Sequence, residues 1–353
     1  MAFGAVSSVH HFCWVARALV ALLVNLFGFP VTHYVDNFPV VMYSGLAPAA
    51  QKLIDSFFGL LGWPTKEQSP FLPSFVCLGV VFRIGESIHI ANKPERLSDI
   101  AAELHDLKRQ QLLPAPLAAR IRGKLGFARA QVFGRLGGPA LRALAVVERG
   151  AASPADISTA LLLLSQLIES MGSMRPRRLP PHFLTPVLIF TDGACEPRPN
   201  SSLLVTIGGV IIRPGSDTIE CFGEEVPADL VRAWAAKGKK QVIGQAELAP
   251  VLVAKTLWAP DLLDVALLAF VDNEAAKFSL VSGVSPTPAS EAILWASALC
   301  DAHLGTHQWV SRVPSASNPA DAPSRLEFPG GWRRRRVRRV DWAALLNAVP
   351  GPT

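Results

Sequence analysis

Four carboxylates in the C-terminal half of the chain, Asp192, Glu247, Asp272 and Asp321, have neighbours that suit a metal site. Asp192 and Asp272 each close an apolar run, IFTD and AFVD. A carboxylate at the end of a buried strand costs free energy unless it is paired or binds a cation. Glu247 lies in the apolar run AELAPVLV, and Asp321 opens the final predicted helix, in NPADAPSR.

Each of these carboxylates alone has a plain structural explanation, since Asp321 could cap a helix and Glu247 could lie on a surface. The set of four is more specific. Asp and Glu without Cys or His at ligand spacing suit Mg²⁺ or Mn²⁺, which prefer hard oxygen ligands. Two such ions about 4 Å apart can activate a water and stabilise the leaving oxygen in phosphodiester cleavage. The sequence therefore predicts a two-ion hydrolytic site.

The elements that must position these carboxylates begin at residue 187. Apolar and β-branched runs predict five strands, at 187–193, 203–213, 217–226, 264–272 and 307–315. Helical spacing of apolar residues predicts helices at 245–259, 273–283 and 290–305. Strands that come first and then alternate with helices indicate a mixed sheet covered by helices. We therefore expect residues 187–330 to form an α+β or α/β domain with a mixed five-stranded sheet.

The region upstream, residues 93–174, is predicted to be helical and carries basic residues among apolar ones, including Arg120, Arg122 and Lys124. Such charges usually solvate a helix face, and they can also contact nucleic acid. Residues 175–186, RPRRLPPHFLTP, are rich in Pro and Arg and predict a linker and domain boundary.

The last segment, residues 331–353, is strongly basic. It contains six arginines in a run, among them Arg333, Arg334, Arg335 and Arg336. A run of like charge usually solvates a flexible tail, and it can also touch phosphates. We expect this tail to contribute to nucleic-acid binding.

The N-terminal residues 1–92 contain a second candidate for chemistry, the stretch HYVDNF at 33–38. Apolar segments flank it on both sides, which predicts a hairpin with its turn at Asp36-Asn37. The preceding segment, residues 12–31, is long and apolar, but Arg17, Asn25 and Pro30 interrupt it. Its length and charge favour a buried helix over a membrane span or a signal segment, so no membrane association is expected.

Composition sets the limits on function. The chain has 353 residues, half of them hydrophobic and 18% charged, which suits two or three folded domains. The formal net charge of +6 favours polyanionic partners. Five cysteines are scattered without a CxxC pair, which indicates neither a zinc module nor a disulfide framework. We expect an intracellular protein, nuclear or cytoplasmic and not secreted; composition leaves the oligomeric state open.

Residues 187–327 resemble the ribonuclease H domain of retroelement polyproteins. The matching segments are IFTDGA, LLVTIGGVI, QAELAPVLVA, AFVDNEAA and NPADAPSR. The last resembles the Asn-x-x-Ala-Asp-x-x-Ser-Arg motif of the retrotransposon type. The resemblance implies that Asp192, Glu247, Asp272 and Asp321 are catalytic and bind two Mg²⁺ or Mn²⁺ ions. It also implies cleavage of the RNA strand of an RNA–DNA hybrid. The residue after Asp272 is Asn273, a small departure.

The upstream part resembles a reverse transcriptase. HYVDNF is similar to the Tyr-x-Asp-Asp hairpin of the palm, with Tyr34, Asp36 and Asn37 as the remnant polymerase site. AFGAVSSVHHF resembles the segment bordering the nucleotide, FVCLGVVF the hairpin after the palm, and 121–136 the thumb helices. The chain begins at the nucleotide-bordering segment, so the first catalytic Asp of the family is not in it. Asn37 replaces a second carboxylate, so polymerase activity is not expected.

These inferences predict a truncated palm at 1–92, a helical thumb or connection at 93–174, the linker at 175–186, the ribonuclease H-like domain at 187–330 and the basic tail. One alternative is a non-catalytic remnant that only binds nucleic acid. Another is a transposase or integrase, which usually has three carboxylates at a different spacing and no palm-like segment upstream. The complete carboxylate set favours the hydrolase, since a decayed nuclease would have lost at least one member.

Overall fold

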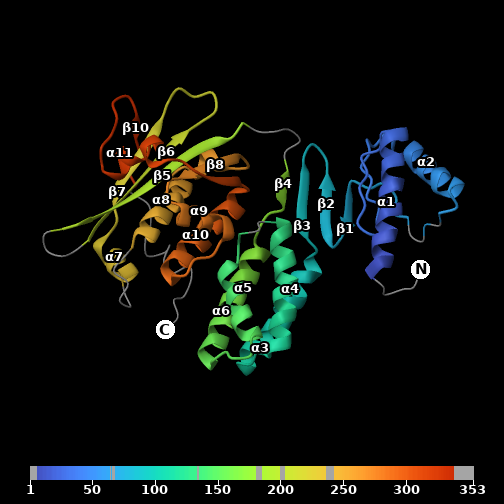
Figure 1. The fold of residues 1–353 in the computed structure, drawn as a ribbon, viewed down its shortest axis with the longest axis horizontal. Coiled ribbons are helices and arrows are strands. Elements are labelled where there is room, and N and C mark those ends of the chain that lie inside the picture. Colours follow the sequence, from blue (N-terminus) through green and yellow to red (C-terminus); the bar gives the residue numbers. More distant parts are fainter. Residues whose placement is uncertain are drawn as a thin grey trace. The chain divides into compact units, whose positions relative to one another are not determined.

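The computed structural model describes residues 6–63, 65, 68–132, 135–179, 185–198, 203–235 and 242–337. The chain divides into two compact units (Figure 1). The first comprises the residues up to Leu78 together with Phe82–Gly85, and the second comprises Gly79–Val81 and the chain from Glu86 onward. The boundary therefore passes through the hairpin formed by β1 (Ser74–Cys77) and β2 (Val80–Ile84).

The first unit is built on two helices, α1 (Val6–Phe27) and α2 (Ala47–Leu60), with the HYVDNF hairpin between them. Backbone bridges join Val31 to Val40 and Tyr34 to Asn37. Apolar and aromatic side chains from both helices and the hairpin form a small core. Its buried members are Leu19, Leu23, Phe29, Ala50, Ile54, Phe57 and Phe58. The predicted hairpin therefore forms part of a packed unit.

Helix α1 is less buried than the sequence predicted. Only one stripe of it, with Ala16, Leu19 and Leu23, lies in the core of its unit. Trp14 is 69% exposed and Leu26 is 64% exposed. The prediction of a buried helix was wrong, because apolar composition does not reveal which faces find a partner. By length and composition alone, the segment Ser7–Phe27 is long and apolar enough to cross a membrane.

The second unit begins with a helical region. Its elements are β3 (Ile88–Asn92), α3 (Pro94–Gln110), α4 (Ala115–Val132), α5 (Gly138–Glu148), α6 (Pro154–Gly172) and β4 (Arg177–Leu179). Ser153 and Asp156 form a reciprocal capping box at the start of α6, which satisfies backbone donors there. Strand β4 pairs antiparallel with β3. Three residues of the predicted irregular linker therefore form a strand.

A six-stranded mixed sheet follows in the order β10-β7-β6-β5-β8-β9. The strands are β5 (Val187–Pro197), β6 (Leu203–Ile212), β7 (Glu220–Glu225), β8 (Ala266–Val271), β9 (His307–Arg312) and β10 (Arg333–Arg334). The first three pair antiparallel, and β8 and β9 continue the sheet in parallel. The five predicted strands are present, and the two-residue β10 adds a sixth beside β7.

The two faces of this sheet are covered differently. Helices α7 (Ala228–Ala235), α8 (Ile243–Leu257), α9 (Glu274–Ser282) and α10 (Pro288–Leu304) follow or alternate with the strands (Figure 1). Their apolar side chains form the main core together with alternate strand residues such as Ile189 and Phe222. We call this the helix-covered face. The opposite face, here the open face, carries a smaller cluster with Val210, Cys221 and Phe328. The short helix α11 (Asp321–Ser324) packs against β5, β6 and β7.

The helical region and the sheet belong to the same compact unit. Trp295 and Ala298 of α10 are buried in the core of the helical region. A Cβ atom on Gly138, at the start of α5, would lie 2.2 Å from the carbonyl oxygen of Gly283. The backbone of α5 therefore packs directly against the end of α9, an approach that only glycine permits.

Candidate active site

Asp192 and Asp272 owe their proximity to strand register. β5 and β8 pair in parallel from Val187 opposite Leu267 to Phe190 opposite Phe270. Two residues further along each strand are Asp192 and Asp272. Because side chains alternate along strands, these two carboxylates keep the orientation of the stacked rings of Phe190 and Phe270. One prediction needs correction, because β5 does not end at Asp192, which pairs with Gly208 of β6.

Glu247 reaches this point because α8 packs very closely on β5. A Cβ atom on residue 193 would lie 2.2 Å from the carbonyl oxygen of Ala246, so Gly193 is required for this approach. Glu247 is 5% exposed, and Asp192 is 6% exposed. Carboxylate oxygens of Asp192, Glu247 and Asp272 all lie within 4.8 Å of one another. The structure therefore brings three of the four predicted carboxylates together.

The environment of Glu247 and Asp192 opposes their negative charge. Burial raises the pKa of Glu247 to about 9, with further contributions from the charges of Asp272 and Asp192 and an opposing hydrogen bond from Asn273. Burial also raises the pKa of Asp192, and its hydrogen bond from Ser324 opposes the shift. Within the described residues, Glu247 Oε2 and Asp272 Oδ1 are buried and accept no hydrogen bond. Unpaired buried oxygens of this kind fit a divalent cation.

Asp321 stands beside the cluster rather than in it. Its carboxylate pairs with Arg325, one helical turn later, at 3.1 Å from Asp321 Oδ1 to Arg325 Nη2. The Asp321 side chain is 46% exposed. Its charge nevertheless contributes to the raised pKa of Asp192. The structure therefore places the fourth predicted carboxylate near the site, held by an arginine.

Ser324 was not singled out from the sequence. Its hydroxyl lies 2.5 Å from Asp192 Oδ2 and 2.8 Å from the carbonyl oxygen of Asp321. A Cβ atom on Gly208 would lie 2.2 Å from the Ser324 backbone nitrogen, so this glycine admits α11 to the sheet. Ser324 thus orients the most central carboxylate. The signal was its place in NPADAPSR, three residues after Asp321.

Two further polar residues hold the ends of the strands. The Asn318 side-chain amide donates to the Thr191 carbonyl oxygen at 3.1 Å, which fixes the loop before α11 against β5. The Ser315 hydroxyl donates to Asp272 Oδ2 at 2.8 Å. Neither contact could be predicted from the sequence, because each joins residues that are distant in the chain.

The HYVDNF hairpin has a different character. Tyr34 and Asn37 exchange backbone hydrogen bonds of 2.9 and 3.0 Å, so the turn is centred on Val35-Asp36, one residue before the predicted position. Val35 has φ of +51°, a strained value for a β-branched residue. Asp36 is exposed, and its recorded side-chain partner is the Asn37 amide at 3.3 Å. Among the described residues, the only clustered acidic set is the one in the second unit.

The predicted basic residues of the helical region are partly paired. On α4, Arg120 pairs with Glu103, and Arg122 pairs with Glu148 at 2.6 Å. Lys124 is exposed on the same helix. Arg333, Arg334, Arg335 and Arg336 lie in and directly after β10, so this part of the predicted tail is ordered against the sheet.

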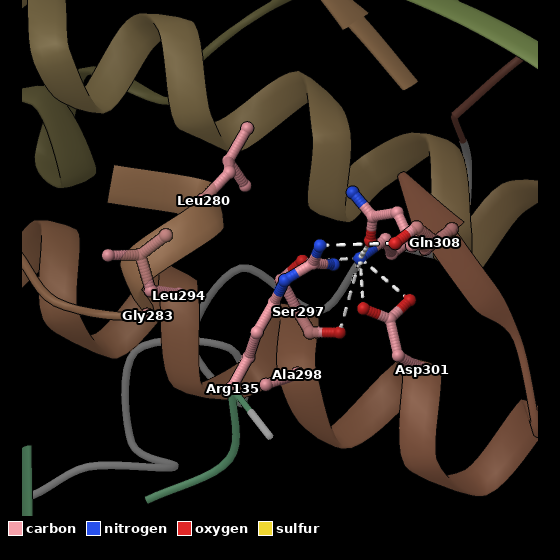
Figure 2. Close-up of a pocket in the computed structure, with 9 residues that line it drawn as sticks. Arg135, Leu280, Gly283, Leu294, Ser297, Ala298, Asp301 and Gln308 are labelled. Carbon is pink, nitrogen blue, oxygen red and sulfur yellow. Dashed lines mark hydrogen bonds and ion pairs between the residues drawn. The ribbon is translucent and has the colours of Figure 1, made fainter. Parts of the chain in front are cut away.

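A second polar cluster lies between α8, α10 and β9 (Figure 2). Lys255 is 1% exposed, and its Nζ lies 2.8 Å from the Asp301 carboxylate and 2.8 Å from Ser297 Oγ. Arg135, which precedes α5, donates to the Gln308 carbonyl oxygen at 3.1 Å. Burial lowers the pKa of Lys255, and the charge of Asp301 opposes that shift. The Lys255 ammonium is paired with Asp301 and hydrogen-bonded to Ser297, so we interpret this cluster as structural. Through Arg135 it links the helical region to the sheet.

No protein-family profile matches the chain, and no curated protein matches it. Among solved structures, RNase H1 from the halophilic archaeon Halobacterium salinarum NRC-1 is 19% identical, with a TM-score of 0.30 over 40% of this chain and 96% of that one. A structure of the foamy viral protease-reverse transcriptase in complex with double-stranded DNA is 14% identical, with a TM-score of 0.38 over 85% of this chain and 49% of that one.

A second foamy viral structure, in complex with an RNA/DNA hybrid, is 12% identical, with a TM-score of 0.33 over 89% of this chain and 61% of that one. The chain therefore spans about half to three fifths of the length of these viral proteins. The identities and TM-scores are low. The activity of this chain is accordingly inferred from its own side chains.

Proposed function

We propose that this protein is a metal-dependent nuclease of the ribonuclease H type, which cleaves the RNA strand of RNA–DNA hybrids. The observation that carries the proposal is the set of Asp192, Glu247 and Asp272. Their carboxylate oxygens lie within 4.8 Å of one another, and two of these oxygens are buried without a hydrogen-bond donor among the described residues. A purely structural cluster of three acids would need basic partners, so the arrangement suits Mg²⁺ or Mn²⁺.

Each residue has a role in this proposal. Asp192 would be a metal ligand, and the Ser324 hydroxyl orients it. Glu247 and Asp272 would be further ligands, and the Ser315 hydroxyl orients Asp272. Asp321 would be a fourth ligand, and its ion pair with Arg325 holds its carboxylate in place. When bound, two ions would supply an activated water and charge stabilisation at the leaving oxygen.

The proposal extends to substrate and origin. The motif NPADAPSR resembles the retrotransposon type, which motivates the choice of a hybrid substrate and of RNA as the cleaved strand. A nuclease that recognises the 2′-hydroxyl distinguishes RNA from DNA at the cut site. The polymerase-like part is proposed to be inactive, because the residue after Asp36 is Asn37, an amide at the position where a second carboxylate would be needed. A binding remnant without turnover is the competing function.

The test uses the full chain and a hybrid labelled on either strand, with Mg²⁺ or with EDTA. We expect cleavage of the labelled RNA strand only, and only with the metal. Asp192→Asn keeps the shape of the side chain and removes its charge, so it should abolish cleavage and leave hybrid binding intact. Asp217→Asn removes an exposed carboxylate on the β6–β7 turn and is the matched control. Cleavage by Asp192→Asn at the wild-type rate would establish a structural cluster and favour the binding remnant.

A further inference from the structure

The first arginines of the basic segment form a strand. Arg333 and Arg334 pair in parallel with Glu220 and Cys221 of β7. The backbone nitrogen of Arg333 donates to Ile219 at 2.9 Å, and that of Arg335 donates to Cys221 at 2.8 Å. In an extended strand, consecutive side chains point to opposite faces of the sheet. The arginines are therefore divided between the two faces.

Arg333 and Arg335 share the face of Glu220, the helix-covered face. Glu220 is 5% exposed, and the two arginines lie 3.5 and 3.8 Å from its carboxylate. The same carboxylate accepts a hydrogen bond from Trp258 at 3.2 Å and forms an ion pair with Arg213 at 3.0 Å. A buried carboxylate requires such partners. These two arginines therefore anchor β10 to the sheet.

Arg334 and Arg336 take the opposite orientation. The Arg334 guanidinium lies 3.8 Å from the centroid of the Phe328 ring, which belongs to the open-face cluster with Cys221. Val337 packs against the core of the helix-covered face, so the residue before it, Arg336, points with Arg334 toward the open face. Both arginines are exposed, and neither forms an ion pair with a carboxylate of the described residues. Their charges are available to a ligand.

Asp192 and Asp272, two carboxylates of the candidate active site, also point toward the open face, and Glu247 reaches them from α8. Asp192 has the orientation of Phe190, and α11 covers the strands beside it, with Ser324 over Gly208 and Pro323 over Gly223. Phe328, beneath Arg334, contacts the same position, since a Cβ atom on Gly223 would lie 3.0 Å from its ring. β10 and β5 are separated by three strand spacings in the sheet order. At about 4.8 Å for each spacing, this gives about 14 Å.

We propose that Arg334 and Arg336 bind backbone phosphates of the nucleic-acid duplex whose cleavage site lies at Asp192. This inference rests on the proposed function. About 14 Å corresponds to about four base pairs along a duplex at 3.4 Å each. The contacted phosphates therefore lie several nucleotides from the cut. A guanidinium held over an aromatic ring, as Arg334 is over Phe328, is preorganised for bidentate contact with phosphate oxygens. Arg333 and Arg335 have the positioning role of holding β10.

The test compares two double variants that remove the same charge, Arg334→Ser with Arg336→Ser and Arg333→Ser with Arg335→Ser. Binding of the full chain to a fluorescent hybrid is measured by anisotropy in EDTA from 50 to 300 mM NaCl, and Tm is measured for each protein. We call the Arg334 and Arg336 double variant the outward pair and the Arg333 and Arg335 double variant the inward pair. For the outward pair we expect the log–log salt slope of binding to be smaller by about 1.8, from about 0.9 for each of two contacts, and Tm to be unchanged. For the inward pair we expect a lower Tm.

The outcomes separate this inference from the proposed function, because binding in EDTA does not depend on cleavage. An unchanged slope in the outward pair overturns the inference, even if the protein is an active nuclease. An equal loss of slope in both pairs at equal Tm also overturns it, since it would indicate an undivided basic tail. Failure of the inward pair to fold supports the anchoring role. Arg334→Lys with Arg336→Lys should restore most of the slope, and an equally reduced slope there would also contradict phosphate binding.

Discussion

Asp192 and Asp36 each lie in a motif that resembles a catalytic motif, but their surroundings are opposite. Asp192 is 6% exposed, and carboxylate oxygens of Asp192, Glu247 and Asp272 lie within 4.8 Å of one another. Asp36 is exposed at the tip of a hairpin, and its recorded side-chain partner is a neutral amide. A carboxylate gains the capacity to hold a cation from burial and from like charges close by. The surroundings of Asp192 are therefore suited to binding a cation, and the described residues around Asp36 form no such acidic cluster.

The two regions also differ in what their neighbours do. Around Asp192 and Asp272, the hydroxyls of Ser324 and Ser315 fix the orientation of the carboxylates. At the hairpin, the backbone of Val35 is strained, and among the described residues Asn37 is the one side chain that donates a hydrogen bond to the Asp36 carboxylate. A functional site needs such support, because loosely held groups do not maintain a productive geometry. The following changes test this contrast, from the largest expected effect to the smallest.

Removal of one carboxylate from the cluster should have the largest effect. Asp272→Asn or Glu247→Gln should lower the rate of hybrid cleavage by about 10³-fold, since a lost ligand removes several kcal/mol of transition-state stabilisation. Single-turnover kinetics with Mg²⁺ measure this directly. Glu196→Gln, an exposed carboxylate near the end of β5, should leave the rate unchanged. A cluster variant with the rate of the control would place the active site elsewhere.

Loss of the Ser324 hydroxyl should have a smaller effect. Ser324→Ala removes the hydrogen bond to Asp192 and should lower cleavage by about 10- to 100-fold, the usual range for a residue that orients a metal ligand. Raising the Mg²⁺ concentration should recover part of the loss, because the ligands remain. Ser317→Ala, in the same loop, is a control with an exposed side chain. A metal-independent loss of the same size would contradict an orienting role.

Asp321 should matter less than Asp192, because it lies outside the three-carboxylate cluster and is paired with Arg325. We expect Asp321→Asn to reduce turnover by about tenfold, which corresponds to about 1.4 kcal/mol. Comparison of kcat at saturating Mg²⁺ with kcat of Asp192→Asn gives the test. Equal losses in both variants would show that Asp321 is a full member of the cluster.

The metal-free protein should become less stable as pH rises. The ordinary pKa of Glu247, 4.5, is raised to about 9 in the folded state. Between these values the folded state binds more protons than the unfolded state, so the free energy of unfolding falls with increasing pH. We expect Tm in EDTA to decline across this window, and Glu247→Gln to flatten the decline. Mg²⁺ should raise Tm most at the high-pH end, because binding displaces the proton.

Changes at the hairpin should have the smallest effect. Asp36→Asn removes an exposed carboxylate of the first unit and should leave cleavage unchanged. Asn37→Asp should not produce primer extension, because it yields two exposed carboxylates without buried or orienting neighbours. Extension assays with a primed template and deoxynucleotides measure this. Template-directed synthesis by this chain would overturn the contrast between the two regions.

Strand ends and short polar motifs allowed much of this site to be predicted. Asp192 and Asp272 were recognisable because each follows an apolar run, and register then brings them together. The pairing of Asp321 with Arg325 and the contact of Ser324 with Asp192 were not predicted, because a motif gives residue types but not which side chains meet. These contacts depend on the close approach of α11 over Gly208.

The other differences between prediction and structure have the same physical origin. The basic segment was expected to be a free tail, yet Arg333 and Arg335 lie beside Glu220, a buried residue far away in the sequence. Composition shows charge and cannot show its partner. Helix α1 was expected to be buried because it is apolar, and Trp14 and Leu26 are nevertheless exposed. Apolar content gives the capacity for burial, and the burial itself depends on what lies opposite.

Because β5 and β8 share one register, the site is sensitive to insertions and deletions within these two strands and less sensitive to which apolar residues they contain. Four paired positions, from Val187 opposite Leu267 to Phe190 opposite Phe270, align Asp192 with Asp272. Substitutions of one apolar residue by another in these pairs alter packing and leave the alignment intact. Loss or gain of a single codon within them would turn one carboxylate to the other face, because side chains alternate with a period of two. Variants of this chain that keep the proposed activity should therefore keep the spacing in these two stretches constant, even where the residues within them have changed.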